Sequence, residues 1–349
     1  MRLYSRLRII DDTGLPKKGT HSVGVKRQYC GQVGKTANCQ VAVSLSVASN
    51  TASLPVAYRL FLPEDWAHDK DRRAKVGVPD DVTFKTKGEI ALEQIDAARA
   101  ADITQGVIVA DAGYGNSTPW RTKLTERGLS YIVGVLSNVS VWPPGTAPLP
   151  PTGKGRRPNT RLRRDENHQP VWAKELAQAL DQEQWQTVTW REGSNAPLSS
   201  RFAVVRVRPA NGDCKRSQAR DVEWLLIEWP ENEDEPTKYW LSTLPEDTKI
   251  EDLVDIAKLR WRIERDYQDL KQEIGLGHYE GRGWRGFHHH AALAIVAYGF
   301  LICEAGAFSP LARETGGSIH SSPSGRCRYQ PQGPQIPAGF RPRGAAATV

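Results

Sequence analysis

The order of strand-like and helix-like segments in the first 135 residues is the feature that most restricts the fold of this chain. A run of segments rich in β-branched residues comes first, and helical and strand patterns then take turns. The predicted strands are 7–10, 21–30, 39–48, 54–62, 106–111 and 129–135, and the predicted helices are 88–102 and 118–128. This order predicts an α/β fold with a mixed sheet and flanking helices.

The rest of the chain is expected to complete this domain around an insertion. Between residues 141 and 245, a loop rich in Pro and Arg precedes further strand patterns, which indicates a β-rich insertion. Helical periodicity returns over 250–274, and an apolar helix follows near 288–307. The predicted divisions are 1–140 and 246–308 for the main domain, 141–245 for the insertion and 309–349 for a disordered or degenerate tail.

The composition indicates a soluble protein with a polyanionic partner. The 349 residues contain 47 Lys and Arg against 40 Asp and Glu, which gives a net charge of +7. The longest apolar run, 291–303, is shorter than the roughly 20 residues that span a membrane, so we expect a buried core helix there. Residues 1–10 contain no secretory signal and the cysteines no CxxC pair. The expected location is therefore the cytoplasm, without a membrane partner.

Two acids share one local setting. Asp11 and Asp111 each follow an apolar strand pattern and precede a turn that contains glycine. A strand end is a rigid support for a metal ligand, so both side chains are candidate ligands. The alternative is that each Asp only closes its strand, because Asp is a common turn residue.

A third acid lies in the helical pattern of residues 260–273. At about 100° per residue, Arg260, Glu264, Tyr267 and Lys271 fall on one stripe beside the apolar face of this helix. A carboxylate at this border can meet a cation while packing holds it in place. The alternative is an exposed helix stabilised by ion pairs, since a pair such as Arg260 and Glu264 contributes about 0.2 to 0.5 kcal/mol.

Together, these three carboxylates predict a particular chemistry. No Cys or His ligand set accompanies them, and carboxylate oxygens suit Mg²⁺ or Mn²⁺. Two such ions, about 3.5 to 4 Å apart, can activate a water or hydroxyl nucleophile at a phosphodiester and stabilise the leaving oxygen. The expected reaction is phosphoryl transfer on nucleic acid.

The spacing of these residues resembles that of a known family. The chain is similar to the DDE transposases of bacterial insertion sequences, in the branch with a Tyr, Arg, Glu and Lys signature around the third acid. In that signature Arg lies four residues before Glu and Lys seven after it, as do Arg260, Glu264 and Lys271. The stretches "IIDDTGL" and "VIVADAGYG" resemble the strands that carry the family's first two acids. The resemblance extends over about residues 8–307.

The resemblance implies a fold, a site and an activity. The fold would be ribonuclease H-like, as in retroviral integrases, with a β-rich insertion before the third acid. Asp11, Asp111 and Glu264 would be the catalytic acids that hold Mg²⁺ or Mn²⁺, while Arg260 and Lys271 would contact DNA. The protein would be a transposase that cleaves and transfers DNA strands at insertion-sequence ends, as a homodimer on DNA, associated with the nucleoid.

The choice between the two adjacent acids of "IIDDTGL" also follows from the resemblance. The family places its first acid two residues before a Thr, here Thr13, so we select Asp11 and keep Asp12 as the alternative. Successive strand residues face opposite sides, so only one of the two can face the site. We expect Asp12 to face the turn or solvent and to hydrogen-bond nearby backbone.

Two departures from the family favour an alternative function. The family's Tyr would fall three residues before Arg260, where this chain has Ala257, and Tyr267 is the candidate replacement. Ten residues precede Asp11, where the family usually has a helical DNA-binding region, which indicates a truncated copy. The alternative is therefore an inactive transposase remnant with at most non-specific DNA binding.

A basic stretch and a histidine run remain. The stretch 153–164 contains no acid and is expected to contact DNA phosphates, although a solvated loop is the plainer interpretation. Its arginines are Arg156, Arg157, Arg161, Arg163 and Arg164. Three consecutive histidines at 288–290 point about 100° apart on a helix, so they are expected to lie at the surface or near DNA rather than share one metal ion.

Overall fold

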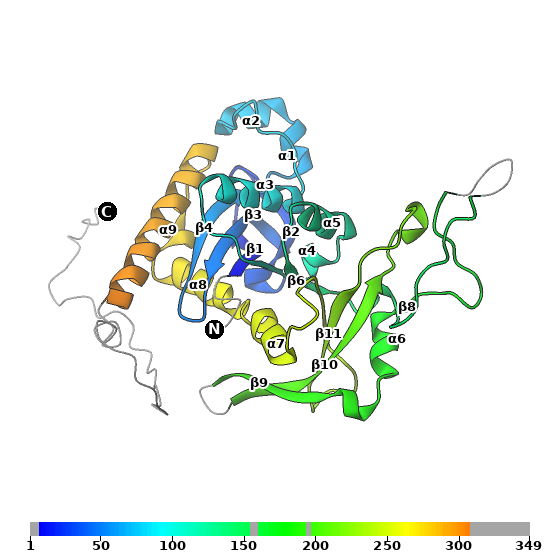
Figure 1. Cartoon of the computed structure of the whole chain (residues 1–349). Coiled ribbons are helices and arrows are strands. Elements are labelled where there is room, and N and C mark those ends of the chain that lie inside the picture. Colours follow the sequence, from blue (N-terminus) through cyan, green and yellow to red (C-terminus); the bar gives the residue numbers. More distant parts are fainter. Residues whose placement is uncertain (1–6, 154–159, 193–196, 308–349) are drawn as a thin grey trace, which may run out of the picture. The chain divides into compact units, whose positions relative to one another are not determined.

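A computed structural model describes residues 7–153, 160–192 and 197–307, and a sheet of twelve strands forms the centre of this described part (Figure 1). The strands are β1 (Leu7–Pro16), β2 (Lys26–Cys30), β3 (Lys35–Ala48), β4 (Ser53–Leu60), β5 (Val107–Ala110), β6 (Tyr131–Val135), β7 (Ser140–Trp142), β8 (Val171–Trp172), β9 (Gln186–Glu192), β10 (Pro197–Pro209), β11 (Glu223–Trp229) and β12 (Lys238–Ser242). The helices are α1 (Glu64–His68), α2 (Lys70–Val76), α3 (Lys87–Ala100), α4 (Ala112–Gly115), α5 (Thr118–Glu126), α6 (Ala173–Gln178), α7 (Ile250–Lys258), α8 (Trp261–Gln272) and α9 (Trp284–Ala307). The predicted mixed α/β fold is confirmed.

Strand β1 lies in the middle of the part of the sheet that carries the first two acids. It pairs antiparallel with β3 along its whole length and parallel with β5 over Leu7 to Ile10. β5 pairs parallel with β6, and the other edge of β3 pairs with β2 and then with β4. The antiparallel strands β4, β3 and β1 therefore continue directly into the parallel strands β5 and β6.

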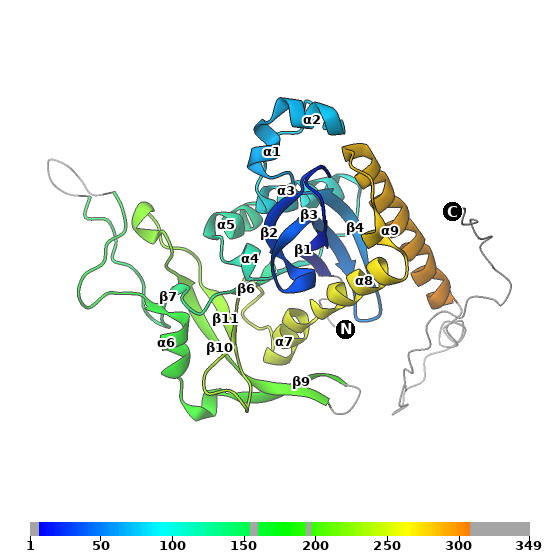
Figure 2. The same ribbon diagram turned by 180° about the vertical axis from the view of Figure 1, so that it is seen from behind.

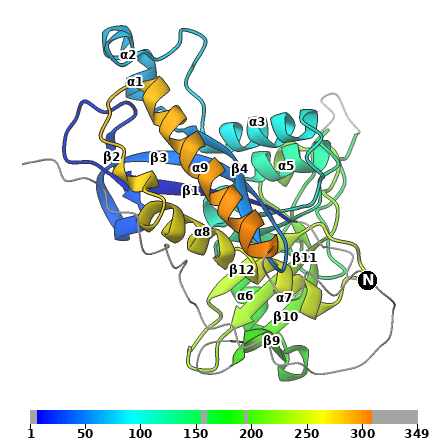
Figure 3. The ribbon, with the colours of Figure 1, turned by 90° about the vertical axis from the view of Figure 1, so that its left-hand side faces the viewer.

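Helices cover both faces of this sheet (Figure 3). On one face, Ile10 of β1 packs in a cluster with apolar residues of α3 and α5. On the other face, Ile9 packs with apolar residues of α7, α8 and α9. Because side chains alternate along a strand, adjacent residues of β1 reach different helical layers.

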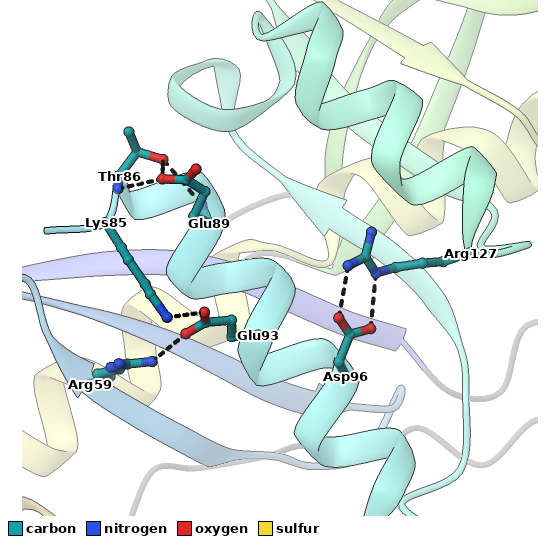
Figure 4. Close-up of polar contacts among 7 residues, drawn as sticks. All are labelled: Arg59, Lys85, Thr86, Glu89, Glu93, Asp96 and Arg127. Carbon is teal, nitrogen blue, oxygen red and sulfur yellow. Dashed lines mark hydrogen bonds and ion pairs between the residues drawn. The ribbon is translucent and has the colours of Figure 1, made fainter. Parts of the chain in front are cut away.

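Helix α3 carries a row of ion pairs that connect it to its neighbours (Figure 4). Glu93 accepts a hydrogen bond from Arg59 of β4 at 2.6 Å, and Asp96 accepts two from Arg127, the residue after α5, at 2.9 and 2.8 Å. Surface pairs of this kind contribute about 0 to 1 kcal/mol each. The buried apolar side of α3, which includes Ile90 and Ile95, therefore supplies most of its attachment to the sheet.

Strands from the predicted insertion continue the same sheet. β12 pairs antiparallel with β6, and β11, β10, β7 and β8 follow in that order. Figure 2 shows β9, β10 and β11 extending away from β1, with α6 beside them. The β-rich character predicted for 141–245 is thus present, and the division of the chain at those residues stays a prediction. The tail predicted at 309–349 lies outside the described residues.

Several predicted boundaries were wrong. β1 continues through both acids to Pro16, because β3 pairs with it beyond the end of β5, so Asp11 is not at a strand end. The turn after Asp111 contains the short helix α4. Helices α1 and α2, of five and seven residues, were not predicted, because so few turns leave no clear periodicity.

The helix predicted over 250–274 is two helices. α7 ends at Lys258 and α8 begins at Trp261. At the junction, the N–H groups of Arg262 and Ile263 donate to the carbonyls of Leu259 and Arg260, three residues back instead of four. This tighter turn bends the helix without interrupting its apolar spacing, so the sequence pattern does not reveal it.

Helix α9 is not the buried core helix that we predicted. Ala291 and Ala294 pack against the sheet side, while Leu293, Val296 and Phe300 are exposed, the last two at 68% and 63%. The sequence of this helix is apolar on all sides, so the pattern does not show that only one side is buried. Among the described helices, it is the one whose length and composition, over 284–304, would also suit a membrane span, a property that core helices of soluble proteins share.

His288 of α9 holds a neutral imidazole between two backbone groups. Its Nε2 accepts from the N–H of Leu60 at 3.3 Å, and its Nδ1 lies 3.0 Å from the carbonyl of Trp284, so Nδ1 must carry the proton. Burial lowers the pKa of His288, and the charge of Arg59 acts in the same direction. His288 is therefore half-buried and held by backbone groups, whereas His289 is exposed, and a position near DNA stays a prediction for the three histidines.

The titration of His288 is expected to lower the free energy of unfolding as the pH falls from about 7 to about 5, whereas the raised pKa values of Asp11 and Asp266 act in the opposite direction. We therefore expect the free energy of unfolding to fall more, or rise less, over this range in the wild type than in His288→Gln. An unfolded histidine binds a proton near pH 6.5, whereas folded His288 does so only at lower pH, so the unfolded state takes up more protons in this window. The effect is at most about 1.4 kcal/mol per pH unit. Urea unfolding at several pH values measures it. His289→Gln, at an exposed position, is the control, and equal slopes in wild type and His288→Gln would contradict the assignment.

Candidate active site

The register of β1 and β5 places the first two candidate acids side by side. Ile10 is opposite Ala110 in the parallel pairing, and the next residues are Asp11 and Asp111. The Asp111 carboxylate accepts from the N–H of Gly113 at 2.9 Å, and that of Asp11 accepts from the N–H of Asp12 at 2.9 Å. Burial raises the pKa of Asp11 to about 7. The charges of Asp111 and Asp12 add to this rise, and Arg260 opposes it.

Alternation along β1 separates Asp11 from Asp12. The Asp11 carboxylate, only 8% exposed as a residue, reaches the α8 layer, where Arg260 donates to it at 2.8 Å. The Asp12 carboxylate reaches the α3 layer, where Lys87 donates to it at 2.6 Å. Our expectation that Asp12 would hydrogen-bond nearby backbone was wrong, because the first turn of α3 offers a charged partner.

Arg260 connects the first candidate acid to the third. One guanidinium nitrogen is 2.8 Å from Asp11, and the other is 2.9 Å from Glu264, whose side chain is 63% exposed. Among the described residues, no three His, Cys, Asp or Glu side chains lie close enough together to hold a metal ion. Asp11 therefore lies beside Asp111 in the sheet, and the positive charge of Arg260 lies between Asp11 and Glu264.

The other two residues of the predicted stripe face β1 and β3. Lys271 donates to the carbonyl of Gly14 at 3.1 Å, and burial lowers its pKa. Tyr267 is buried and donates to the Ser44 hydroxyl, which itself donates to the carbonyl of Asp11 at 3.3 Å. Tyr267 thus supports the strand that carries Asp11, and it has no ring surface available as a replacement for the family's Tyr. A DNA contact by Lys271 stays a prediction.

The arginines of the basic stretch lie on the segment before α6. Arg164 donates to Asp213 at 2.5 Å and to the carbonyl of Ala210, and Arg163 donates to the carbonyl of Pro150. Arg161 is exposed, while Arg156 and Arg157 lie outside the described residues. These contacts give Arg163 and Arg164 structural partners, and contact with phosphate stays a prediction for the whole set.

Two glycines let the turn that carries Asp111 rest on the neighbouring strand. A Cβ at Gly115 would lie 2.1 Å from the carbonyl oxygen of Gly134 and 2.8 Å from the Val133 side chain. A Cβ at Gly134 would lie 3.0 Å from the N atom of Ala112. The sequence indicated a turn here but not this contact, since β6 follows some twenty residues later.

Gly115→Ala is expected to lower the free energy of unfolding by about 1 to 3 kcal/mol, because a backbone carbonyl cannot move aside as a side chain can. Urea unfolding followed by circular dichroism measures the change. Gly31→Ala is the matched control, since nothing lies within 4 Å of its added Cβ. Equal stability of the two variants would show that α4 can shift away from β6.

Comparison with known proteins now decides the family. The sequence profile of the DDE superfamily endonucleases matches residues 3–197, which is more than half of the chain. The chain belongs to this family. The matched range contains Asp11 and Asp111 and ends before Glu264. The family and the ribonuclease H-like fold expected from the sequence are thus confirmed for this chain.

One relative matches a shorter part of the chain. The chain is 33% identical over 131 residues to the probable transposase for insertion sequence element IS701 of Microchaete diplosiphon. The aligned region covers 37% of this chain and 32% of that protein. The chain therefore matches about a third of the length of this relative.

Proposed function

We propose that this DDE endonuclease is a transposase that cleaves and transfers DNA strands at insertion-sequence ends with the help of divalent metal ions. The observation that carries the proposal is the register that places Asp11 beside Asp111, on the face where Arg260 connects to Glu264. The relative's name, a probable transposase, supports the choice of DNA as substrate.

The donor atoms fit a hard cation. Asp11, Asp111 and Glu264 offer only carboxylate oxygens, the ligands that suit Mg²⁺ and Mn²⁺. Mutual repulsion between Asp11 and Asp111 contributes to the raised pKa of Asp11, and a bound cation relieves such repulsion. When bound, the metal ions would polarise the phosphodiester and the attacking oxygen. Glu264 joins the other two acids once Arg260 releases it.

The protein's own groups prepare this site. The N–H groups of Asp12 and Gly113 orient the carboxylates of Asp11 and Asp111. Asp11 must lose its proton before it can act as a ligand, and because burial raises its pKa to about 7, metal binding at neutral pH would displace that proton in part of the molecules. Arg260 holds Asp11 in position until DNA and metal arrive.

We assign the contacts with DNA to basic side chains. Arg260 and Lys271 would lie near the cleaved bond, and the stretch that contains Arg156, Arg157, Arg161, Arg163 and Arg164 would contact phosphates further along. The net charge of +7 agrees with a polyanionic partner. The protein would act as a homodimer on paired ends, in the cytoplasm where bacterial DNA lies.

An inactive remnant that binds DNA non-specifically is the second candidate. The pairing of Glu264 with Arg260, and Ala257 where the family has Tyr, favour it. Incubation of the full chain with supercoiled plasmid and Mg²⁺ or Mn²⁺ separates the two. Metal-dependent conversion to nicked or linear DNA supports the transposase, and unchanged plasmid that is retarded on a gel supports the remnant.

A further inference from the structure

Helix α9 presents a row of apolar side chains that no described element covers. Leu293, Val296 and Phe300 are 58%, 68% and 63% exposed, and Leu301 beside them is 42% exposed. In Figure 3, where α9 lies nearest to the viewer, its outer side is free of other described helices and strands. Contiguous exposed apolar patches on soluble proteins commonly mark interaction surfaces. The outer side of α9 is therefore a candidate docking surface.

The opposite side of α9 is held firmly, so the exposed row does not belong to a frayed helix. Phe287, Ala291 and Ala294 are buried against the rest of the domain. Tyr298 Oη donates a hydrogen bond to Asp266 of α8 at 3.0 Å. The exposed side chains are thus held in fixed positions, which lowers the entropic cost of binding a partner.

Strand β4 widens this apolar surface along one edge of α9. The N–H of Leu60 donates to His288, and the Leu54 side chain lies 3.3 Å from the place that a Cβ on Gly299 would take. β4 therefore runs alongside α9 between these two contacts. Val56 lies on that part of β4 and is 36% exposed. The docking surface is thus wider than a single row of side chains.

The spacing of the exposed row is that of a seam between two helices. Its members follow one another in alternating steps of four and three residues: His289, Leu293, Val296, Phe300 and Cys303. This is the a and d spacing of a coiled coil, in which the side chains of one helix fit between those of another. No Lys, Arg, Asp or Glu occurs from Gly286 to Cys303. An apolar helix therefore fits this surface better than a charged partner does.

The row is also complementary to itself. We consider two copies of α9 that run antiparallel about a two-fold axis passing between Leu293 and Val296. Leu293 then lies opposite Val296 of the second copy, and His289 lies opposite Phe300, so each a position meets a d position. At both ends of the seam, Cys303 meets Gly286, which leaves room for the sulfur. A second copy of this chain is therefore an occupant whose shape and charge fit.

We propose that two copies of this chain associate through α9, antiparallel and without DNA. The homodimer in the proposed function forms on paired DNA ends, whereas this contact depends on neither DNA nor metal. A membrane surface is the other occupant that the length and composition of α9 suit. The self-complementary spacing favours a second copy, because a lipid surface sets no spacing for the side chains that enter it.

Sedimentation velocity of the full chain in EDTA, without DNA and over a range of protein concentrations, tests this proposal. We expect the wild type to form a dimer. Leu293→Glu and Val296→Lys should each raise the dimer dissociation constant at least about tenfold, because each places an unpaired charge in the seam. The two variants should bind each other at least about tenfold more tightly than either binds itself, since the introduced acid then lies opposite the introduced base.

A matched control and separate outcomes make the test decisive. Val33→Lys adds the same charge at a valine outside α9 that is 42% exposed, and it should dimerise as the wild type does. Circular dichroism checks that every variant is folded. A monomeric wild type, a dimer that Leu293→Glu and Val296→Lys leave intact, or a mixture of these two that stays monomeric would each overturn the proposal.

Two further measurements separate this proposal from its alternatives. Flotation of a monomeric wild type with vesicles of phosphatidylcholine and phosphatidylglycerol would overturn the pairing and assign the outer side of α9 to a membrane surface. Plasmid nicking by a chain that stays monomeric without DNA would contradict the α9 dimer and leave the proposed function intact. A dimer that loses its pairing in Val296→Lys but never nicks plasmid would support the α9 dimer and contradict the proposed function.

Discussion

Asp11→Asn is expected to lower the rate of metal-dependent plasmid nicking by about 10³-fold, whereas Asp12→Asn lowers it less than about tenfold. The two residues are adjacent and carry the same side chain. They differ in the face of β1 that they occupy, since Asp11 lies beside Asp111 and Arg260, and Asp12 pairs with Lys87. Loss of one carboxylate from the acid cluster removes charge from the place where a divalent ion would bind.

The rates are compared only between variants that are correctly folded. Thermal unfolding monitored by circular dichroism checks that both variants are intact, and the initial rate of nicking is measured with Mg²⁺ and with Mn²⁺. Asp111→Asn and Glu264→Gln should resemble Asp11→Asn. If Asp12→Asn were the inactive variant and Asp11→Asn the active one, the first catalytic acid would be Asp12.

Arg260→Gln is expected to raise the affinity for Mn²⁺ by about tenfold while it lowers nicking activity. In the wild type, the guanidinium is hydrogen-bonded to both Asp11 and Glu264, so a cation must displace a positive charge that already neutralises two of its ligands. A tenfold change corresponds to about 1.4 kcal/mol, just below the range of about 1.5 to 3 kcal/mol for one hydrogen bond to a charged group. Activity should decrease because the variant loses the proposed contact with DNA and the support for Asp11.

Isothermal titration calorimetry with Mn²⁺ measures the affinity in the absence of DNA. Arg262→Gln is the matched control, since this arginine lies two residues further on and donates to the carbonyl of Asn50 instead of an acid. It should bind Mn²⁺ as the wild type does. Weaker Mn²⁺ binding by Arg260→Gln would mean that Arg260 arranges the acids for the metal instead of competing with it.

Much of the fold was predictable because it depends on local patterns. Strands around Ile10, Val43 and Ile108 and the helix around Ile90 were expected close to where they occur, since alternation and helical spacing are properties of short windows. The burial of α9 was not predictable in the same way. Whether Leu293 or Val296 is covered depends on what lies opposite, and composition does not contain that information.

The candidate site was also only partly predictable from the sequence. The residue types at Asp11, Asp111 and Glu264 and the spacing around Arg260 could be read from the chain, and they led to the DDE family that the comparison confirmed. The hydrogen bond of Arg260 to Asp11 could not be predicted from the sequence, and neither could the pairing of Asp12 with Lys87. Each of these contacts joins segments 75 or more residues apart.

By itself, the sequence determined the α/β order, the family and the set of candidate acids, because each follows from residue identity and short-range spacing. The tertiary structure alone decided which acid of the adjacent pair faces the α8 layer and that a positive charge lies between Asp11 and Glu264. These features depend on strand register and on which helix covers which face of the sheet. Both are set by long-range packing, which no short stretch of the chain encodes.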